Sequence, residues 1–429
     1  MSISRAPRIL FALTHVARPF FASVLVQMRR ASDAAAPQPP KFRHMSPEHR
    51  RRALEAWHNL PVGTLDEHVV PEPTLNALYE NVWGTFGMAF CAVPNVVING
   101  KKVTIPGVTE EPSIVAALAN ASKVPYEGEG PSRAICTAQL LFVRQAPGGL
   151  LKQAINRLRA EENGLRALLQ DQGPDKIKRL FIRGGGFAGP WVYSWLSKQM
   201  FVTEMPFDVR EAMGANLVNI AAEYLGPKMA QILGKEWASR LHILTNNAEY
   251  RISTATQRIP IASLATSTLT GKEVAERMVD AYRFAKLNEN RAITNNKGGM
   301  NGASALALAT GQDIRGLEAA AHFYARNLGV NPNTGAPQYG PLASWAIEGD
   351  HLVGRVALPT PTTTVGRLVE EHPGVRLAFK LLGNPTNRDL GLYLAVAFLG
   401  SNGAALRALC TDGINAGHLR LHSEYKSKP

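Results

Sequence analysis

The sequence predicts a mixed α and β protein of two or three domains. Its 429 residues exceed the usual size of a single domain. Hydrophobic residues make up 45% of the chain and charged residues 19%, which is the balance of a globular protein with a sizeable core. β-rich runs on both sides of an Asn-Gly pair, together with several long amphipathic stretches, indicate that strands and helices both contribute.

The clearest strand signal is a hairpin over residues 96–105. Asn99-Gly100 separates two β-rich runs, as a two-residue type I′ turn requires. The returning strand leads to an acid pair, and a helix is expected from about Pro112 to Ser122 because proline suits the first helical position. Glu111 is therefore expected at a strand-to-helix junction, beside a helix N-terminus.

The period of the apolar residues predicts further elements along the chain. Helices are expected over residues 49–57, 150–171, 212–233 and 272–287, and strands over residues 178–183, 200–209 and 241–245. A loop rich in Asn and Gly is expected over residues 291–301, before a stretch of helical tendency at 303–327 that contains Gly311. Residues 390–409 combine helix-like apolar stretches with a glycine-containing gap.

The first 32 residues have the composition of a mitochondrial transit peptide. They contain five arginines and no acidic residue, and they are rich in Ala, Ser and large apolar side chains. A disordered basic tail and a secretory signal are the alternatives, although Arg18 and Pro19 interrupt the apolar region that a secretory signal needs. Residues 34–40 are expected to be a flexible join, with folded structure from near Lys41.

Charge argues against a nucleic-acid partner. Residues 1–52 hold ten Lys and Arg and two acids, so +8 of the formal net charge of +13 belongs to that segment. The remaining chain is mildly basic, which suits phosphate-bearing cofactors at least as well as a nucleic-acid groove. The sequence has neither zinc-finger spacing nor a basic strand interleaved with aromatic residues.

Membrane-spanning, disulfide-rich and metal-binding classes are not indicated either. The longest apolar candidate, residues 9–26, is interrupted by polar residues and a proline, so it falls short of the roughly 18 residues that span a bilayer. Cys91, Cys136 and Cys410 are sparse and far apart, which indicates a reducing compartment and no disulfide framework. No Cys or His cluster suggests a metal.

The segment Gly184–Gly189 fits the GxGxxG pattern of dinucleotide-binding folds and follows a predicted strand. That fingerprint needs a helix to begin at once, so that its N–H groups face the pyrophosphate. Here Pro190-Trp191 follows the glycines instead. A glycine-rich turn is therefore the favoured interpretation, and a Rossmann site is the alternative.

Two segments combine small residues with groups that bind ligands. In Asp208–Asn219 a strand ends and small residues begin a helix, which lets a ligand approach N–H groups at the positive helix end. Close helix packing explains the same small residues. In Thr294–Gly302, Lys297 lies among glycines and amides and could stabilise a developing oxyanion. A solvent-facing lysine in a loop is the alternative.

Two further segments carry titratable residues. Asp313 follows an apolar helical stretch, where an acid is costly unless paired, and Lys297 is a plausible partner. An ordinary cap or surface acid is the alternative. His418 and His422 are spaced i, i+4 on one helix face near the C-terminus. Metal binding lacks an evident third ligand, so an acid/base imidazole carried on a tail is the competing interpretation.

Taken together, these segments resemble hydroxymethylglutaryl-CoA reductases in their soluble, second-class form, over roughly residues 41–425. Six separated motifs match in the family's order, and the first of them resembles its dimerisation motif: residues 80–86, 95–117, 208–219, 294–302, 311–313 and 417–418. One motif alone would not be specific, whereas the ordered set is. The basic N-terminal extension, absent from bacterial relatives, resembles that of a eukaryotic enzyme without a membrane anchor, as in trypanosomatid parasites.

The resemblance implies a role for each matching residue. The catalytic positions are Glu111, Lys297, Asp313 and His418, with Asp313 holding Lys297 in place. The substrate-binding positions are Ser113, Arg291, Asn301, Asn246 and His422. The cofactor-binding positions are Met213, Gly214 and Asn216, and no metal is implied.

The resemblance also implies an α+β architecture. A large helical and mixed domain would contain an inserted small ferredoxin-like α+β cofactor domain and would end in a short C-terminal flap. The expected boundaries are residues 1–40 for the transit peptide and linker, 41–136 and 246–403 for the large domain, 137–245 for the small domain and 404–429 for the flap with His418.

The implied activity is the four-electron reduction of hydroxymethylglutaryl-CoA to mevalonate and CoA, the committed step of isoprenoid synthesis. NADPH is the expected cofactor, with NADH possible. The expected assembly is a homodimer or a higher multiple, with active sites at the subunit interface, in the mitochondrial matrix. The alternatives are a non-catalytic homologue that binds CoA or a nucleotide, and a Rossmann dehydrogenase built on Gly184–Gly189.

Overall fold

The computed structural model describes residues 41–147 and 149–413. These described residues fall into two compact units, within residues 41–62 and 63–413. Within the described part of the first unit, a 3₁₀ turn at Phe42–His44 precedes helix α2 (Pro47–Trp57). Ser46 caps α2, because its hydroxyl accepts a hydrogen bond from the backbone N–H of His49 at 3.2 Å. The predicted helix over residues 49–57 is confirmed.

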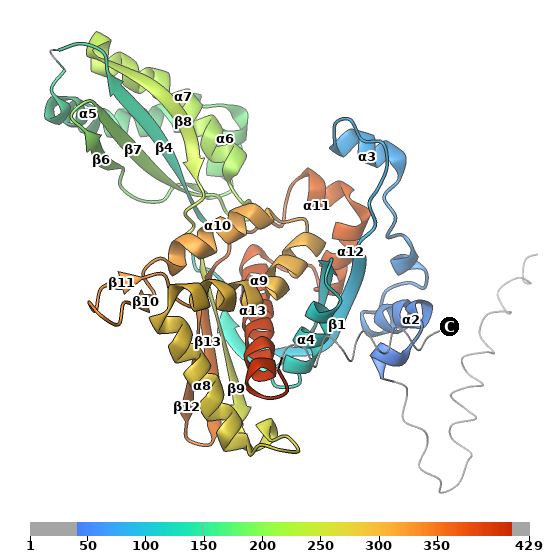
Figure 1. Ribbon diagram of the computed structural model, residues 1–429. Helices are drawn as coiled ribbons and strands as arrows, with labels where there is room; N and C mark the ends of the chain where they lie inside the picture. Colours follow the sequence, from blue (N-terminus) through green and yellow to red (C-terminus); the bar gives the residue numbers. More distant parts are fainter. Residues whose placement is uncertain (1–40, 148, 414–429) are drawn as a thin grey trace, which may run out of the picture. The chain divides into compact units, whose positions relative to one another are not determined.

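The second unit is built around a six-stranded sheet (Figure 1). Its strands lie in the order β12 (Ala343–Glu348), β13 (His351–Pro359), β9 (Ile252–Pro260), β3 (Tyr126–Glu129), β1 (Ala89–Ile98) and β2 (Lys101–Thr109). Neighbouring strands are antiparallel except β1 and β3, which are parallel. The sheet therefore joins segments from both ends of the unit, with β9 at its centre.

The predicted hairpin forms the β1–β2 pair. Asn99 has φ 49° and Gly100 has φ 75°, so both turn residues take the positive φ values of a type I′ turn. The Asn99 side chain also pairs with the backbone of Gly128 in β3, through two bonds of 3.0 Å. After β2, helix α4 (Ser113–Ala121) begins behind Pro112. Glu111 therefore lies in the short link between the strand and the helix, as predicted.

Four long helices form the main core with this sheet: α8 (Gly271–Leu287), α9 (Glu289–Ala309), α10 (Ile314–Ala325) and α13 (Asn387–Cys410). α9 and α13 pack against each other, and α9 also contacts β2 (Figure 1). By length and composition, α13 is one described helix that could cross a membrane. The apolar window of α13 is 67% buried inside the protein, which marks it as a core helix.

The prediction of a loop over residues 291–301 is wrong, since these residues lie inside α9. Asn288 caps the helix by accepting a hydrogen bond from the backbone N–H of Arg291 at 2.9 Å. The glycines that suggested a loop have a packing role, because Gly299 faces the ring of Phe398 and Gly302 faces the backbone of α13. The predicted helical stretch 303–327 falls into two helices. Gly311, with φ 64°, lies in the turn that separates α9 from α10.

Replacing Gly302 with Ala is expected to lower the free energy of unfolding by about 1–3 kcal/mol, the usual cost of overpacking. A Cβ atom there would overlap the Ala397 carbonyl oxygen and Ser401 Oγ, so α9 and α13 would have to separate. Gly298→Ala is the matched control, because its Cβ would meet only the Ala405 methyl at 3.6 Å. Urea unfolding of both variants measures the difference, and equal midpoints would contradict the packing argument.

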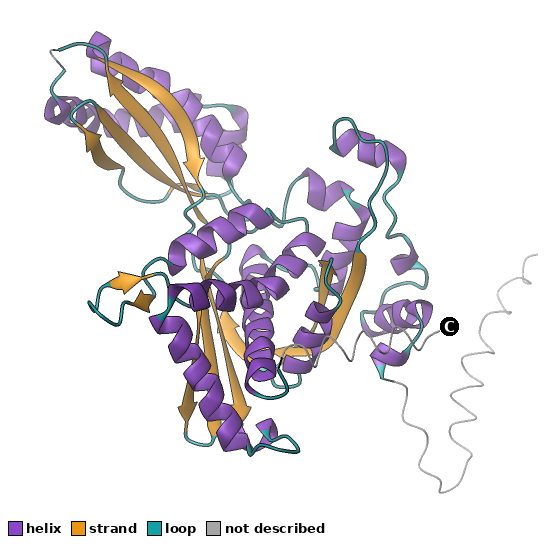
Figure 2. Ribbon diagram, viewed as in Figure 1, coloured by secondary structure: helices purple, strands orange, loops and turns teal. Residues whose placement is uncertain are grey.

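A second core surrounds a smaller antiparallel sheet, and helices cover one of its faces (Figure 2). The strand order is β5 (Gly186–Phe187), β7 (Met200–Asp208), β4 (Ile135–Arg144) and β8 (Trp237–Thr245), and β6 (Val192–Ser197) also pairs with β7. The helices are α5 (Leu151–Gln172), α6 (Asp175–Ile182) and α7 (Ala215–Leu233). This βαββαβ order with every neighbour antiparallel is the ferredoxin-like arrangement. The domain boundaries themselves stay predictions.

The strand predicted over residues 178–183 is wrong, because this segment belongs to α6. Ile177 and Leu180, three residues apart, are buried on one helix face, and Asp175 lies in the first turn. In Gly184–Gly189, Gly184 lies in a turn with φ 77° and Gly186 begins the short strand β5, which fits the favoured interpretation of a glycine-rich turn. No helix follows them, and the sheet is antiparallel, so the Rossmann alternative is excluded.

Shorter elements complete the described part of the second unit. They are the helices α3 (Glu72–Leu78), α11 (Arg367–Glu371) and α12 (Pro373–Leu381), the strands β10 (Gly329–Val330) and β11 (Pro337–Gln338), and the 3₁₀ turns Thr64–Asp66, Gly234–Glu236 and Ile261–Leu264.

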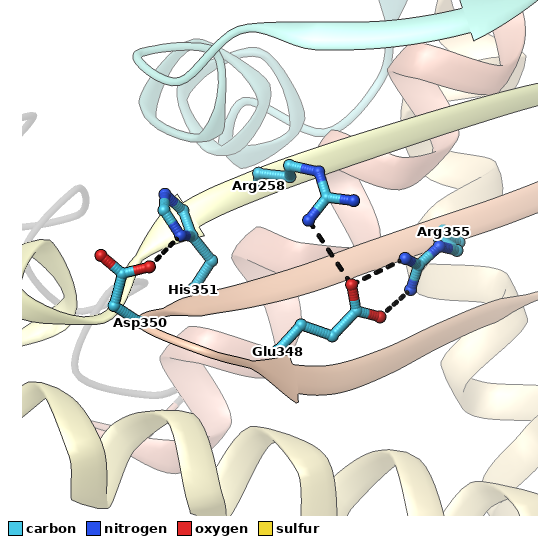
Figure 3. A network of polar contacts seen from close by, with 5 residues as sticks. All are labelled: Arg258, Glu348, Asp350, His351 and Arg355. Atoms are coloured by element: carbon cyan, nitrogen blue, oxygen red, sulfur yellow. Dashed lines mark hydrogen bonds and ion pairs between the residues drawn. The ribbon is translucent and has the colours of Figure 1, made fainter.

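A network of polar contacts on the surface links residues of β9, β12 and β13 (Figure 3). Glu348 accepts two hydrogen bonds from Arg355, at 2.6 and 2.9 Å, and lies 3.4 Å from Arg258. These arginines lower the pKa of Glu348, with the Arg355 bond as the main cause. His351 Nδ1 lies 2.6 Å from Asp350. Such exposed pairs are screened by solvent and salt, so they add little to stability.

Candidate active site

Three polar side chains meet where α9 passes the link between β2 and α4. Lys297 Nζ lies 3.7 Å from Glu111 Oε2, and Ser113 Oγ donates a hydrogen bond to Glu111 Oε1. The Glu111 backbone N–H is held by Thr109 Oγ1 at 3.2 Å. The side chains of Lys297 and Glu111 are 66% and 33% exposed, so the pair is open to a ligand. The structure thus brings together residues that are 186 positions apart in the chain.

A buried asparagine fixes the direction in which α9 presents Lys297. Asn296 is fully buried and donates to Tyr339 Oη and to the Gly340 carbonyl, each at 3.0 Å. Its side-chain oxygen accepts a hydrogen bond from the backbone N–H of Leu342 at 2.8 Å. Because consecutive helical residues point about 100° apart, locking Asn296 inward helps to direct the neighbouring Lys297 toward Glu111.

Asp313 does not make the contact expected of it. No carboxylate oxygen of Asp313 lies within 4.0 Å of Lys297 Nζ among the described residues, and the ion pair of Lys297 is with Glu111. Asp313 instead caps α10, because its side chain accepts a hydrogen bond from the backbone N–H of Gly316 at 3.0 Å. Arg315 Nε lies 3.8 Å from the same carboxylate. The expected pairing of Lys297 with Asp313 is corrected on this point.

The segment Met213-Gly214 begins helix α7 with open N–H groups. Gly214 is its N-cap with φ 108°, and no side chain caps the first turn. A Cβ on Gly214 would lie 2.9 Å from the Cβ of Cys136 in β4, so the backbone here lies directly on the sheet. Asn216 lies exposed in the first turn. The uncapped start of this 19-residue helix suits an anionic group such as a phosphate.

This helix start lies beside Asp313. A methyl group built on Gly316 would lie 2.8 Å from Asp313 Oδ2 and 3.3 Å from Met213 Cε, so both side chains crowd the same glycine. The predicted cofactor segment at the start of α7 and the predicted catalytic aspartate at the start of α10 are therefore neighbours.

The remaining predicted residues occupy different positions. Arg291 lies in the first turn of α9, and Asn301 lies one turn after Lys297 on the same helix face. Asn246 is exposed just after β8. His418 and His422 lie outside the described residues.

Sequence reasoning missed two residues beside this site. Arg251 is 1% exposed and donates to the Met213 carbonyl at 2.8 Å. Gln312 is 8% exposed and exchanges hydrogen bonds with the backbone of Thr363. Gln312 is the chain neighbour of Asp313, and this position was a signal that it belongs to the site. Nothing in the local pattern around Arg251 distinguishes it from a surface arginine.

Comparison with known proteins identifies the family. The family model described as "Hydroxymethylglutaryl-coenzyme A reductase" matches residues 46–423. The chain belongs to the hydroxymethylglutaryl-coenzyme A reductase family. One curated member, from Archaeoglobus fulgidus, is 32% identical over 402 residues, which cover 90% of this chain and 85% of the relative.

Solved structures of this reductase family share the fold. A hydroxymethylglutaryl-coenzyme A reductase from Streptococcus pneumoniae superposes with a TM-score of 0.77 at 32% identity, covering 89% of each chain. A class II enzyme from the same organism, bound to NADPH in open conformations, superposes with a TM-score of 0.76 at 31% identity over 86% of this chain and 99% of that one. The reductase described here is accordingly an oxidoreductase of mixed helix and sheet architecture, as predicted.

Proposed function

We propose that this reductase converts hydroxymethylglutaryl-CoA to mevalonate and CoA with two molecules of NADPH, at a site built on Lys297 and Glu111. The observation that carries the proposal is the open ammonium–carboxylate pair at 3.7 Å, with Ser113 bonded to the same carboxylate. In total the thioester takes up two hydrides and two protons. The products are a primary alcohol and the free CoA thiol.

Lys297 supplies the positive charge that this reaction requires near the carbonyl oxygen. Each hydride addition places negative charge on the carbonyl oxygen, and a positioned ammonium stabilises that charge in the transition state. Asn296 and the α9–α13 packing hold the backbone that carries Lys297, so little reorganisation is needed when the charge develops.

Glu111 supplies the proton that the same oxygen requires. Its carboxyl group lies beside Lys297, and Ser113 fixes one carboxyl oxygen while the other faces the ammonium. The Glu111 carboxylate must first take up a proton from solution, and in that protonated form, within reach of the oxyanion, it can deliver the proton as the charge develops. His418, by resemblance to the family, would protonate the departing CoA thiolate and so oppose the reverse reaction.

The segment that would hold NADPH fits a dinucleotide phosphate. The α7 N-terminus is uncapped, Gly214 presents bare backbone, and Arg210 is exposed nearby with φ 56°. NADPH supplies the hydrides when bound. The Streptococcus pneumoniae relative binds NADPH, and on this basis NADPH is proposed here over NADH.

A steady-state assay on the purified chain tests the proposal. NADPH oxidation that depends on hydroxymethylglutaryl-CoA, with two NADPH consumed per mevalonate formed, is expected. Parallel assays with NADH measure the cofactor preference. Binding of both ligands without oxidation would instead identify a non-catalytic homologue.

The segment around Trp83 supports a homodimer. Trp83 and Phe86 are 99% and 93% exposed, although such large apolar side chains normally lie buried. Sedimentation is expected to give a dimer for the native chain and a monomer for Trp83→Asp combined with Phe86→Asp. Ile182→Asp, at another exposed apolar position on α6, is the control and should remain dimeric. A dimer that survives the double substitution would exclude this segment as the interface.

The arginine-rich, acid-free residues 1–32 support import into the mitochondrial matrix, where mevalonate would feed isoprenoid and sterol synthesis. Residues 1–40 fused to a fluorescent protein should direct it to mitochondria. Cytosolic or secreted fluorescence would reject this location.

A further inference from the structure

A buried polar cluster lies where the chain passes between the two cores. Its five members are each no more than 3% exposed: Arg251, Ser253, Thr360, Thr362 and Asn387. Arg251 is the one member with a formal charge. Because an unpaired buried charge is very costly, the contacts of Arg251 show what this cluster holds in place.

Arg251 bridges the two cores through backbone carbonyls. Its Nη1 donates to the Met213 carbonyl and its Nη2 to the Thr362 carbonyl, both at 2.8 Å. Met213 precedes α7 of the small core, whereas Thr362 follows β13 of the large sheet. One planar guanidinium therefore fixes the distance between the start of α7 and the loop after β13.

The loop after β13 also bonds to Glu211, which precedes Met213, and to Gln312, which precedes Asp313. Glu211, two residues before Met213, accepts hydrogen bonds from Thr364 Oγ1 at 2.6 Å and from the Asn387 backbone N–H at 2.7 Å. On the other side, Gln312 donates to the Thr363 carbonyl at 3.1 Å and accepts from its N–H at 2.7 Å. The loop thus connects the start of α7 with the residue that precedes Asp313.

The charge of Arg251 persists at neutral pH. Burial lowers the pKa of its guanidinium to about 10, while Cys136, Asp208 and Glu211 act in the opposite direction. A permanent cation therefore lies behind the Met213 carbonyl, close to the helix end that already carries positive partial charge.

We propose that Arg251 is a positioning residue for the dinucleotide, which fixes the Met213-Gly214 backbone so that the α7 N-terminus faces a phosphate group. This inference rests on the proposed use of NADPH. Arg251 itself is buried behind the backbone and does not touch the ligand. Its contribution lies in preorganisation, since a fixed backbone loses less entropy when the ligand binds.

The test measures equilibrium NADPH binding by the full chain, from quenching of protein fluorescence without the second substrate. Arg251→Lys keeps the charge but cannot hold both carbonyls in one plane. The NADPH dissociation constant is expected to rise about tenfold, while the KM for hydroxymethylglutaryl-CoA stays within a factor of two. The matched control, Ser253→Ala, removes the 2.6 Å bond to Thr360 in the same buried cluster without touching Met213. That control should lose thermal stability yet bind NADPH normally.

Three results would overturn the inference: unchanged NADPH binding by Arg251→Lys, equal weakening for both ligands, or equal weakening of NADPH binding in Ser253→Ala. Should Arg251→Lys not fold, Thr364→Val decides instead, because it removes only the outer bond to Glu211. A severalfold rise of the NADPH dissociation constant supports the inference, and no change rejects it. A native chain that does not bind NADPH would contradict the proposed function instead.

Discussion

Lys297→Ala is expected to reduce turnover of hydroxymethylglutaryl-CoA by roughly 100-fold or more, the usual effect of removing a group that stabilises an oxyanion. The ammonium is the cation paired with Glu111 at 3.7 Å. Without it, negative charge on the substrate oxygen would develop beside a carboxylate. The measurement is kcat at saturating NADPH and substrate, together with the thermal midpoint.

The fold should tolerate this change, because the Lys297 side chain is 66% exposed and alanine favours a helix. Lys272→Ala is the control, since Lys272 is a 78% exposed lysine on α8. That variant should keep native turnover. A Lys297→Ala enzyme within a few-fold of native activity, or one that has lost its thermal transition, would refute the assigned role.

Local sequence patterns predicted the elements that depend only on adjacent residues. The Asn99-Gly100 hairpin follows from two residues that accept positive φ, and the helix after Pro112 follows from proline at its start. The α9 segment could not be predicted in this way. Its glycines are typical of a loop, and only the approach of α13 to Gly302 explains why they are helical. Tertiary packing there outweighs the weak helix propensity of glycine.

The same distinction applies to the site. Family resemblance identified Glu111, Ser113 and Lys297, and the structure places them in contact. Family resemblance could not indicate that Lys297 pairs with Glu111 while Asp313 caps α10. That arrangement depends on the turn at Gly311 after the preceding helix. Arg251 carried no signal, since burial of an arginine depends on carbonyls supplied by distant segments.

Glu111→Gln is expected to lower turnover by about 100-fold or more, within the range that general acid catalysis contributes. The amide keeps the size of the side chain and can still accept the Ser113 hydrogen bond. It cannot deliver the proton that the reduced oxygen needs, and it no longer offers a negative partner to Lys297. The KM for NADPH should change little, because the α7 start is a separate segment.

Glu110→Gln is the sharpest control, because it alters the adjacent acid and removes the same charge from the chain. Glu110 is exposed, whereas Glu111 faces Lys297 and Ser113. If proximity to Lys297 matters, the two substitutions should differ by about two orders of magnitude in kcat. Equal losses would mean that the acid pair acts only through its summed charge. Loss confined to Glu110→Gln would show that the exposed acid delivers the proton and that the Lys297–Glu111 pair serves the fold.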